Sequence, residues 1–173
     1  LDNRFGLLTQ GSRIALPRHQ TLRAAIDWSY DLLTKSEQIL FRSLSVFAGG
    51  FTLDAAEQVC GFGKLKQSHV LPLLGRVVDK SLVFVDAISN AGQTRYRLLE
   101  TIREYALEKL IGSGEESIVR DHHMQFFSRL AIEAEPKLLG TDTIIWVNRL
   151  NAEHANLLAA IHWSLKSKNA DFA

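Results

Sequence analysis

The chain lacks most of the features on which secreted and membrane proteins are built. Its 173 residues include a single cysteine, Cys60, so no intrachain disulfide can form, which favours an intracellular protein. No apolar run approaches the roughly 20 residues that a membrane-spanning helix needs. The first residues show no signal-peptide pattern. We therefore expect a cytoplasmic protein without membrane contact.

Motifs of common catalytic sites are missing as well. The sequence holds no GxxxxGK[ST] phosphate-binding loop, no GxSxG motif and no HExxH motif. Cys60 falls on the apolar face of a predicted helix, where a core thiol is expected. The run Asp121, His122 and His123 does not suit a metal, because adjacent helical residues point about 100° apart. We predict no catalytic residue, metal site or bound cofactor in this chain, and hence no enzyme.

The chain also carries almost no net charge. The 20 basic and 19 acidic residues leave a net charge of +1. A dedicated nucleic-acid-binding protein usually carries a clear basic excess, so DNA contact here would require a local patch. Hydrophobic residues make up 46% and charged residues 23%, as is typical of a globular protein.

Residues 44–110 carry the most informative pattern. Apolar spacing and capping residues predict helices over residues 21–33, 34–48, 53–60 and 68–80, a two-stranded ribbon at 82–86 and 95–99, and a helix from about 100 to 112. A helix-turn-helix followed by a β-hairpin is the order of a winged-helix domain. Proteins of this kind usually bind DNA or another protein, or act as a movable arm in a larger regulator.

The sequence suggests a mainly α-helical fold in three parts. We interpret residues 1–18 as a linker or the tail of a preceding domain, 19–112 as the winged helix, and 113–173 as an α-helical hairpin that begins a helical array. The hairpin would comprise helices over 115–135 and 141–167, with a boundary at Gly112, Ser113 and Gly114. Helical spacing gives each helix an inward apolar stripe: Val119, His123, Phe126, Phe127, Leu130 and Ala134 in the first, and Trp146, Leu150, His154, Leu157, Ile161 and Leu165 in the second. The chain starts with Leu1 rather than methionine, which we interpret as the start of a piece of a longer protein.

Four basic residues mark the surface that would face DNA in a winged helix. Arg76 and Lys80 lie on the helix in the recognition position, and Arg95 and Arg97 are expected to point outward from the wing. A plain solvated face explains them equally well, because Asp79 lies between them and few neighbouring side chains could contact bases. We keep DNA binding by this fragment as an alternative and do not expect it.

Several segments together closely resemble a known family. LPRHQTLRAAIDWSYDLL, LFRSLSVFAGGFTLDAAEQVC, VVDKSLV and RYRLLETIREYALEKL are similar to the winged-helix segment of bacterial STAND-type ATPase regulators, relatives of the NB-ARC proteins. Many of these are transcriptional regulators of the LuxR or antibiotic-regulatory type. AEHANLLAAIHWSL resembles the start of the family's tetratricopeptide-like array. The similarity covers residues 2–164.

The resemblance implies a non-catalytic regulatory arm. Its partners would be a preceding nucleotide-binding domain, which binds ATP or ADP in the parent protein, and a following helical sensor array of the same polypeptide. Relatives carry a Met-His-Asp motif whose histidine reaches the nucleotide phosphates, and the matching residues here are Leu98, Leu99 and Glu100. Leu99 cannot bond a phosphate, so Leu99, Glu100 and Arg103 are candidates for nucleotide sensing or interdomain contact. The alternative is a winged-helix DNA-binding domain of a transcriptional regulator.

Overall fold

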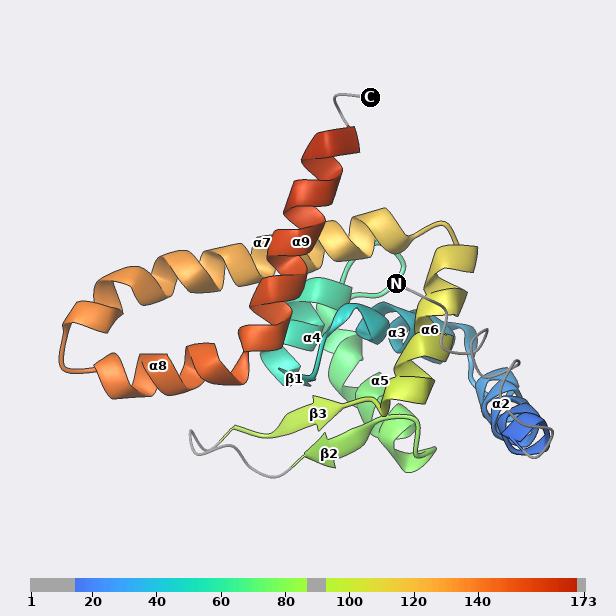
Figure 1. Cartoon of the computed structure of the whole chain (residues 1–173). Coiled ribbons are helices and arrows are strands. Elements are labelled where there is room, and N and C mark those ends of the chain that lie inside the picture. The colour runs from blue at the N-terminus through green and yellow to red at the C-terminus, as the bar shows by residue number, and fades with distance from the viewer. Residues whose placement is uncertain (1–14, 87–92, 171–173) are drawn as a thin grey trace. The chain divides into compact units, whose positions relative to one another are not determined.

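The computed structural model describes the backbone of residues 15–86 and 93–170, and it is mostly helical (Figure 1). The chain divides into two compact units, Leu1–Thr34 and Lys35–Ala173, which are described separately. In the first unit the described part is helix α2 (Ala15–Asp31). The predicted helix is therefore confirmed, but it begins at Ala15, within the segment that we interpreted as a linker. Residues 1–14 of that segment lie outside the described residues.

The second unit opens with the elements of a winged helix. In chain order they are α3 (Lys35–Ser43), the 3-10 turn η1 (Leu44–Val46), β1 (Gly50–Thr52), α4 (Leu53–Cys60), α5 (Gln67–Asp79), β2 (Phe84–Asp86) and β3 (Arg95–Arg97). Thr52 caps α4, its hydroxyl accepting a hydrogen bond from the Ala55 N–H at 3.2 Å. The fold class predicted from the sequence is confirmed.

The sheet has three strands rather than the predicted two. Its order is β1-β3-β2 and both pairings are antiparallel, with Tyr96 opposite Phe51 on one side and Val85 on the other. The sequence did not reveal β1 because three residues are too few to show an alternating pattern. The chain enters this strand through Gly49, whose φ of +99° is a conformation that glycine adopts without strain.

The helices after the wing match the predicted hairpin only in part. They are α6 (Glu100–Gly112), α7 (Glu116–Ala134), the 3-10 turn η2 (Glu135–Leu139), α8 (Thr143–Ala152) and α9 (His154–Ala170). The stripe predicted for α7 is buried throughout: Val119, His123, Phe126, Phe127, Leu130 and Ala134. The single helix expected over 141–167 is wrong, because the helix is interrupted at Glu153, where α8 ends and α9 begins.

An aromatic cluster joins the winged helix to α7. Phe47 stacks on Phe51 with ring centroids 4.8 Å apart and meets Phe127 of α7 edge-on at 6.3 Å. Such rings supply much of the buried apolar area of a small core. The turn at residues 112–114 therefore does not separate two independent cores, and the domain division at residue 112 stays a prediction. No helix in the described parts of the chain has the length and apolar character to traverse a bilayer.

Candidate interaction site

Helix α5 occupies the position of a recognition helix, and its exposed residues are of two kinds. Val70, Leu73, Leu74 and Val77 face the core. The first turn exposes the polar residues Gln67, Ser68 and His69. The exposed residues beyond this turn, here called the α5 face, are Leu71, Pro72, Gly75, Arg76 and Asp79. A Cβ added at Gly75 would meet nothing within 4 Å, so a partner's backbone could approach closely there. Arg76 is the residue of this face whose side chain could bond to base edges, and the first turn of α5 adds Gln67, Ser68 and His69.

Two of the cations predicted for DNA contact lie beside carboxylates. Lys80 at the end of α5 donates from Nζ to the buried Glu37 Oε2 at 2.9 Å. Arg97 on β3 lies 3.8 Å from Asp86 Oδ1 on the neighbouring strand β2. Each carboxylate reduces the positive potential that these residues would present to a phosphate backbone. The exposed Arg76 is left as the principal basic side chain of the α5 face.

Arg95 does not point outward, and the expectation that it does was wrong. Its side chain is only 13% exposed and forms an ion pair with Glu153 Oε1, while Nη2 donates to the Ala152 carbonyl at 3.2 Å. Strand alternation alone placed Arg95 on the solvent side of a hairpin. The junction of α8 and α9 covers that side and supplies the carboxylate. A polar pair three residues apart within the apolar C-terminal segment, Glu153 and Asn156, was the available signal.

The start of α6 holds the three residues that the resemblance singled out. Leu99 is exposed and precedes the helix without a side-chain cap. Arg103 folds back on its own helix, with Nε and Nη2 3.1 and 2.8 Å from the Glu100 carboxylate, and Nη1 3.4 Å from the Ser45 carbonyl. The leucine side chain has no hydrogen-bond donor, and the guanidinium is bonded within the chain. The role of these residues in nucleotide sensing or interdomain contact stays a prediction.

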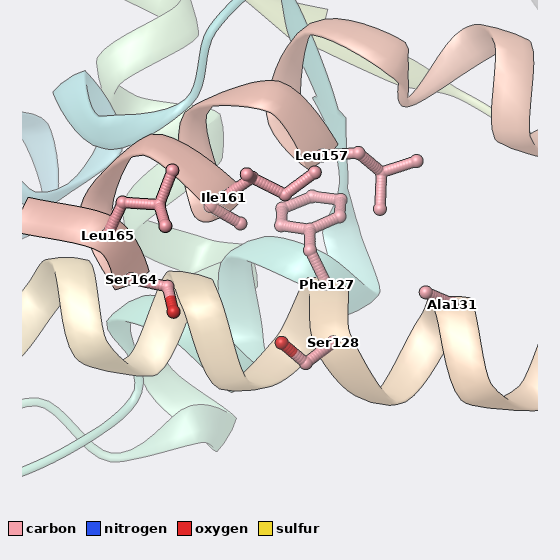
Figure 2. Close-up of a pocket in the computed structure, with 8 residues that line it drawn as sticks. Phe127, Ser128, Ala131, Leu157, Ile161, Ser164 and Leu165 are labelled. Carbon is pink, nitrogen blue, oxygen red and sulfur yellow. The ribbon is translucent and has the colours of Figure 1, made fainter. Parts of the chain in front are cut away.

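A second exposed surface lies between α7 and α9. A groove of about 210 Å³ is lined by Phe127, Ser128 and Ala131 of α7 and by Leu157, Ala160, Ile161, Ser164 and Leu165 of α9 (Figure 2). Ile161 and Leu165, which the apolar spacing placed on the inner face, are 54% and 58% exposed. The helical stripe was predicted, but in the part of the chain that the structure describes nothing covers its C-terminal half.

Burial changes the protonation of two titratable residues of the core, Cys60 and His123. Cys60 is buried, which raises the pKa of its thiol well above the usual range and leaves it unreactive. His123 is 3% exposed and its Nε2 has no hydrogen-bond partner. Burial lowers its pKa to about 4; the Asn156 side chain opposes the shift and Arg120 reinforces it. No group of three His, Cys, Asp or Glu side chains suited to a metal ion occurs among the described residues.

The chain is similar to a protein family and to several mycobacterial proteins. Residues 33–111 match the family described as "Winged helix-turn-helix domain". The chain is 48% identical over 164 residues to "Putative HTH-type transcriptional regulator Rv0890c" of Mycobacterium tuberculosis and to "Putative HTH-type transcriptional regulator Mb0914c" of Mycobacterium bovis, alignments that cover 95% of this chain and 18% of each relative. It is 41% identical over 120 residues to "Uncharacterized protein Rv0894" of M. tuberculosis, covering 69% of this chain and 30% of that protein.

These alignments leave most of each relative outside the comparison, since the chain spans less than a third of the length of any of the three. No solved structure matches the chain significantly. The order of helices and strands and the family match agree for the same stretch of sequence. Residues 33–111 of this chain therefore match that family and have the fold of a winged helix-turn-helix.

Proposed function

We propose that the chain is the winged-helix segment of a longer transcriptional regulator, in which it acts as a non-catalytic arm that contacts other domains of the same polypeptide. The names of the regulators to which it is 48% identical support the general role. Those proteins extend far beyond the aligned region, so other domains are available to contact. The α5 face is the docking surface in this proposal.

The composition of the α5 face is the observation that carries the proposal. A helix that contacts bases in the major groove usually presents Arg, Lys, Asn or Gln side chains to them. Here polar side chains are exposed in the first turn of α5, at Gln67, Ser68 and His69. Beyond that turn, Leu71, Pro72 and Gly75 are exposed, and Asp79 opposes the charge of Arg76. An exposed apolar surface with an open backbone position is the kind of surface that packs against a protein domain.

The resemblance suggests which domains these are. By analogy, a nucleotide-binding domain that holds ATP or ADP would meet the α5 face and the start of α6, and a tetratricopeptide-like array would follow α9. The apolar groove between α7 and α9 supports the proposal that an array follows α9, because helical repeats bury such apolar faces against the next repeat. In this arrangement the winged helix transmits a change in one domain to the other.

DNA binding is the second candidate, and the comparisons favour it. The family is a helix-turn-helix family, and the relatives are named as regulators of the HTH type. In such domains the helix at the position of α5 lies in the major groove and the wing contacts the backbone. The exposed Lys64 and Lys66 precede α5 and, with Arg76, could reach phosphates.

Titration of a fluorescent mixed-sequence DNA duplex with the 173-residue chain separates the two candidates. We expect a dissociation constant no tighter than about 10⁻⁴ M at 150 mM salt, the weak end of non-specific binding, because few unpaired cations face one side. The substitution Arg76→Ala should then change this dissociation constant little. The control is Arg129→Ala, which removes an exposed arginine of α7.

Micromolar or tighter binding would instead support the DNA candidate, provided that it weakens with salt. In that case Arg76→Ala should reduce the slope of log affinity against log salt by about 1, since one phosphate contact is lost, whereas Arg129→Ala should leave the slope unchanged. That pair of results would overturn the docking role of the α5 face.

A further inference from the structure

A buried polar network connects the wing to the start of α9. Arg95 of β3 forms an ion pair with Glu153 Oε1, and Glu153 Oε2 accepts a hydrogen bond from Asn156 Nδ2 at 2.7 Å. The Arg95 and Glu153 side chains are 13% and 7% exposed, and Asn156 is 1% exposed. Glu153, between α8 and α9, thus pairs with a charged side chain of the central strand, and Asn156 of α9 bonds to Glu153 in turn.

The same asparagine also holds the segment that leads into β1. Asn156 Oδ1 accepts from the Ala48 N–H at 2.8 Å, and its Nδ2 donates to the Gly50 carbonyl at 2.9 Å. Gly49, between these two backbone groups, has a φ of +99°, and a Cβ placed there would lie 3.7 Å from the Ala155 Cβ. The turn before β1 therefore rests directly on the first turn of α9.

The network joins segments that lie far apart in the sequence, and it does so at the point where the C-terminal helix is interrupted. The Glu153 N–H donates to the Arg149 and Leu150 carbonyls at 3.1 and 3.2 Å, which closes α8 before α9 starts. Buried ion pairs seldom add stability beyond what well-packed apolar side chains provide, but they fix one arrangement over others. This chain places such a pair between the wing and α9.

We propose that the α9–wing network, defined as Arg95, Glu153 and Asn156, couples the position of α9 to the order of the wing. Movement of α9 separates the carboxylate from Arg95 and withdraws Asn156 from the turn before β1, so strands β1 and β3 lose their fixed positions together. The elements that move as one are the sheet and the first turn of α9. Coupling of this kind runs through directly contacting groups with two discrete arrangements.

The network exists in this chain whatever the α5 face contacts, but its regulatory meaning rests on the proposed function. In the proposed regulator, the helices that pack against the groove between α7 and α9 would pull on α9. The network would then carry that movement to the wing, which lies next to α5 in the winged-helix fold.

Hydrogen exchange measured by mass spectrometry on the 173-residue chain tests the coupling. Asn156→Ala should speed exchange of peptides that contain β1 and β3 by about tenfold or more, because the local opening equilibrium loses hydrogen bonds that held it closed. Exchange in α3 and α5 should stay as in the wild type. The matched control is Asn151→Ala, which removes an exposed asparagine two residues before Glu153.

The reciprocal variant tests the charged half of the network. Arg95→Lys keeps the positive charge but loses the planar group that reaches both Glu153 and the Ala152 carbonyl, and it should speed exchange in the first turn of α9. If Asn156→Ala leaves too little folded protein, Arg95→Lys alone decides. The double variant should exchange no faster in the sheet than the faster single variant, since both remove the same coupling.

Either of two results would overturn the proposal: unchanged exchange in the sheet, or faster exchange spread evenly over α3, α5 and α7, which indicates only a general loss of stability. Neither result depends on DNA or on another domain. Failure of the coupling is therefore distinguishable from failure of the docking role assigned to the α5 face.

Discussion

Replacing Phe127 with alanine is expected to lower the free energy of unfolding by about 3–5 kcal/mol, the usual range for removing a fully buried aromatic ring. Phe127 is 0% exposed and lies where α7 meets the winged helix. Its ring centroid is 4.6 Å from that of His123, 5.0 Å from that of Phe126 and 6.3 Å from that of Phe47. The alanine leaves a cavity that these rings cannot close without moving the helix.

Urea denaturation followed by tryptophan fluorescence measures this loss. The matched control is Ile132→Ala on the same helix, where the side chain is 70% exposed and the expected loss is below about 1 kcal/mol. Similar losses for the two variants would contradict a shared core between α7 and the winged helix. Separate unfolding of α7 and the winged helix in the wild type would contradict it as well, because the contacts within the second unit predict that the two unfold together.

Acid is expected to destabilise the chain through His123. Its pKa is lowered from 6.5 to about 4 in the folded state, chiefly by burial, so between these values the unfolded chain binds more protons than the folded chain. The stabilisation is therefore fully present above pH 6.5 and is lost as the pH falls toward 4. The lost stability should approach about 3 kcal/mol, because each unit of pKa shift corresponds to about 1.4 kcal/mol.

Comparison with His123→Phe isolates this effect from the titration of carboxylates. The variant removes the buried imidazole and keeps a ring of similar size between Phe47 and Phe127. Its free energy of unfolding should fall less steeply than that of the wild type between pH 6.5 and 5. His69→Gln, which replaces an exposed histidine, should behave like the wild type. If the free energy of unfolding depended equally on pH in the wild type and in His123→Phe, protonation of the His123 imidazole would not be linked to unfolding.

The elements best predicted from the sequence are those whose pattern repeats over several turns. The buried stripe of α7 spans residues 119–134, long enough for helical spacing to be unambiguous. The N-cap at Thr52 was also predictable, because the capping hydroxyl acts within its own helix. The outward Arg76 follows from the same spacing, which places the apolar residues of α5 on the opposite side.

The structural features that could not be predicted from the sequence depend on contacts between distant segments. The apolar pattern continues through residue 153, so helical spacing gives no sign of the interruption that the structure has there, where Glu153 pairs with Arg95 of β3. The direction of Arg95 was mispredicted for the same reason, since strand alternation contains no information about a third element that covers the strand. Strand β1 is short and is recognised by its pairing with β3.

Chemical accessibility at position 76 tests the central claim that the α5 face docks against another domain of a longer regulator. Cys60 is buried, so the wild-type chain provides a nearly unreactive background for maleimide labelling. Arg76→Cys places a thiol on the α5 face, and Gln125→Cys places one on an exposed position of α7 as the control. Both variants are labelled in the 173-residue chain and in the protein expressed from its complete gene, and modified peptides are quantified by mass spectrometry.

We expect position 76 to be labelled at least about tenfold more slowly in the complete protein than in the 173-residue chain, because a docked surface reacts only when it opens. Position 125 should be labelled at similar rates in both. Equal rates at position 76 would contradict the account, and slow labelling that appears only when duplex DNA is added would assign the α5 face to DNA.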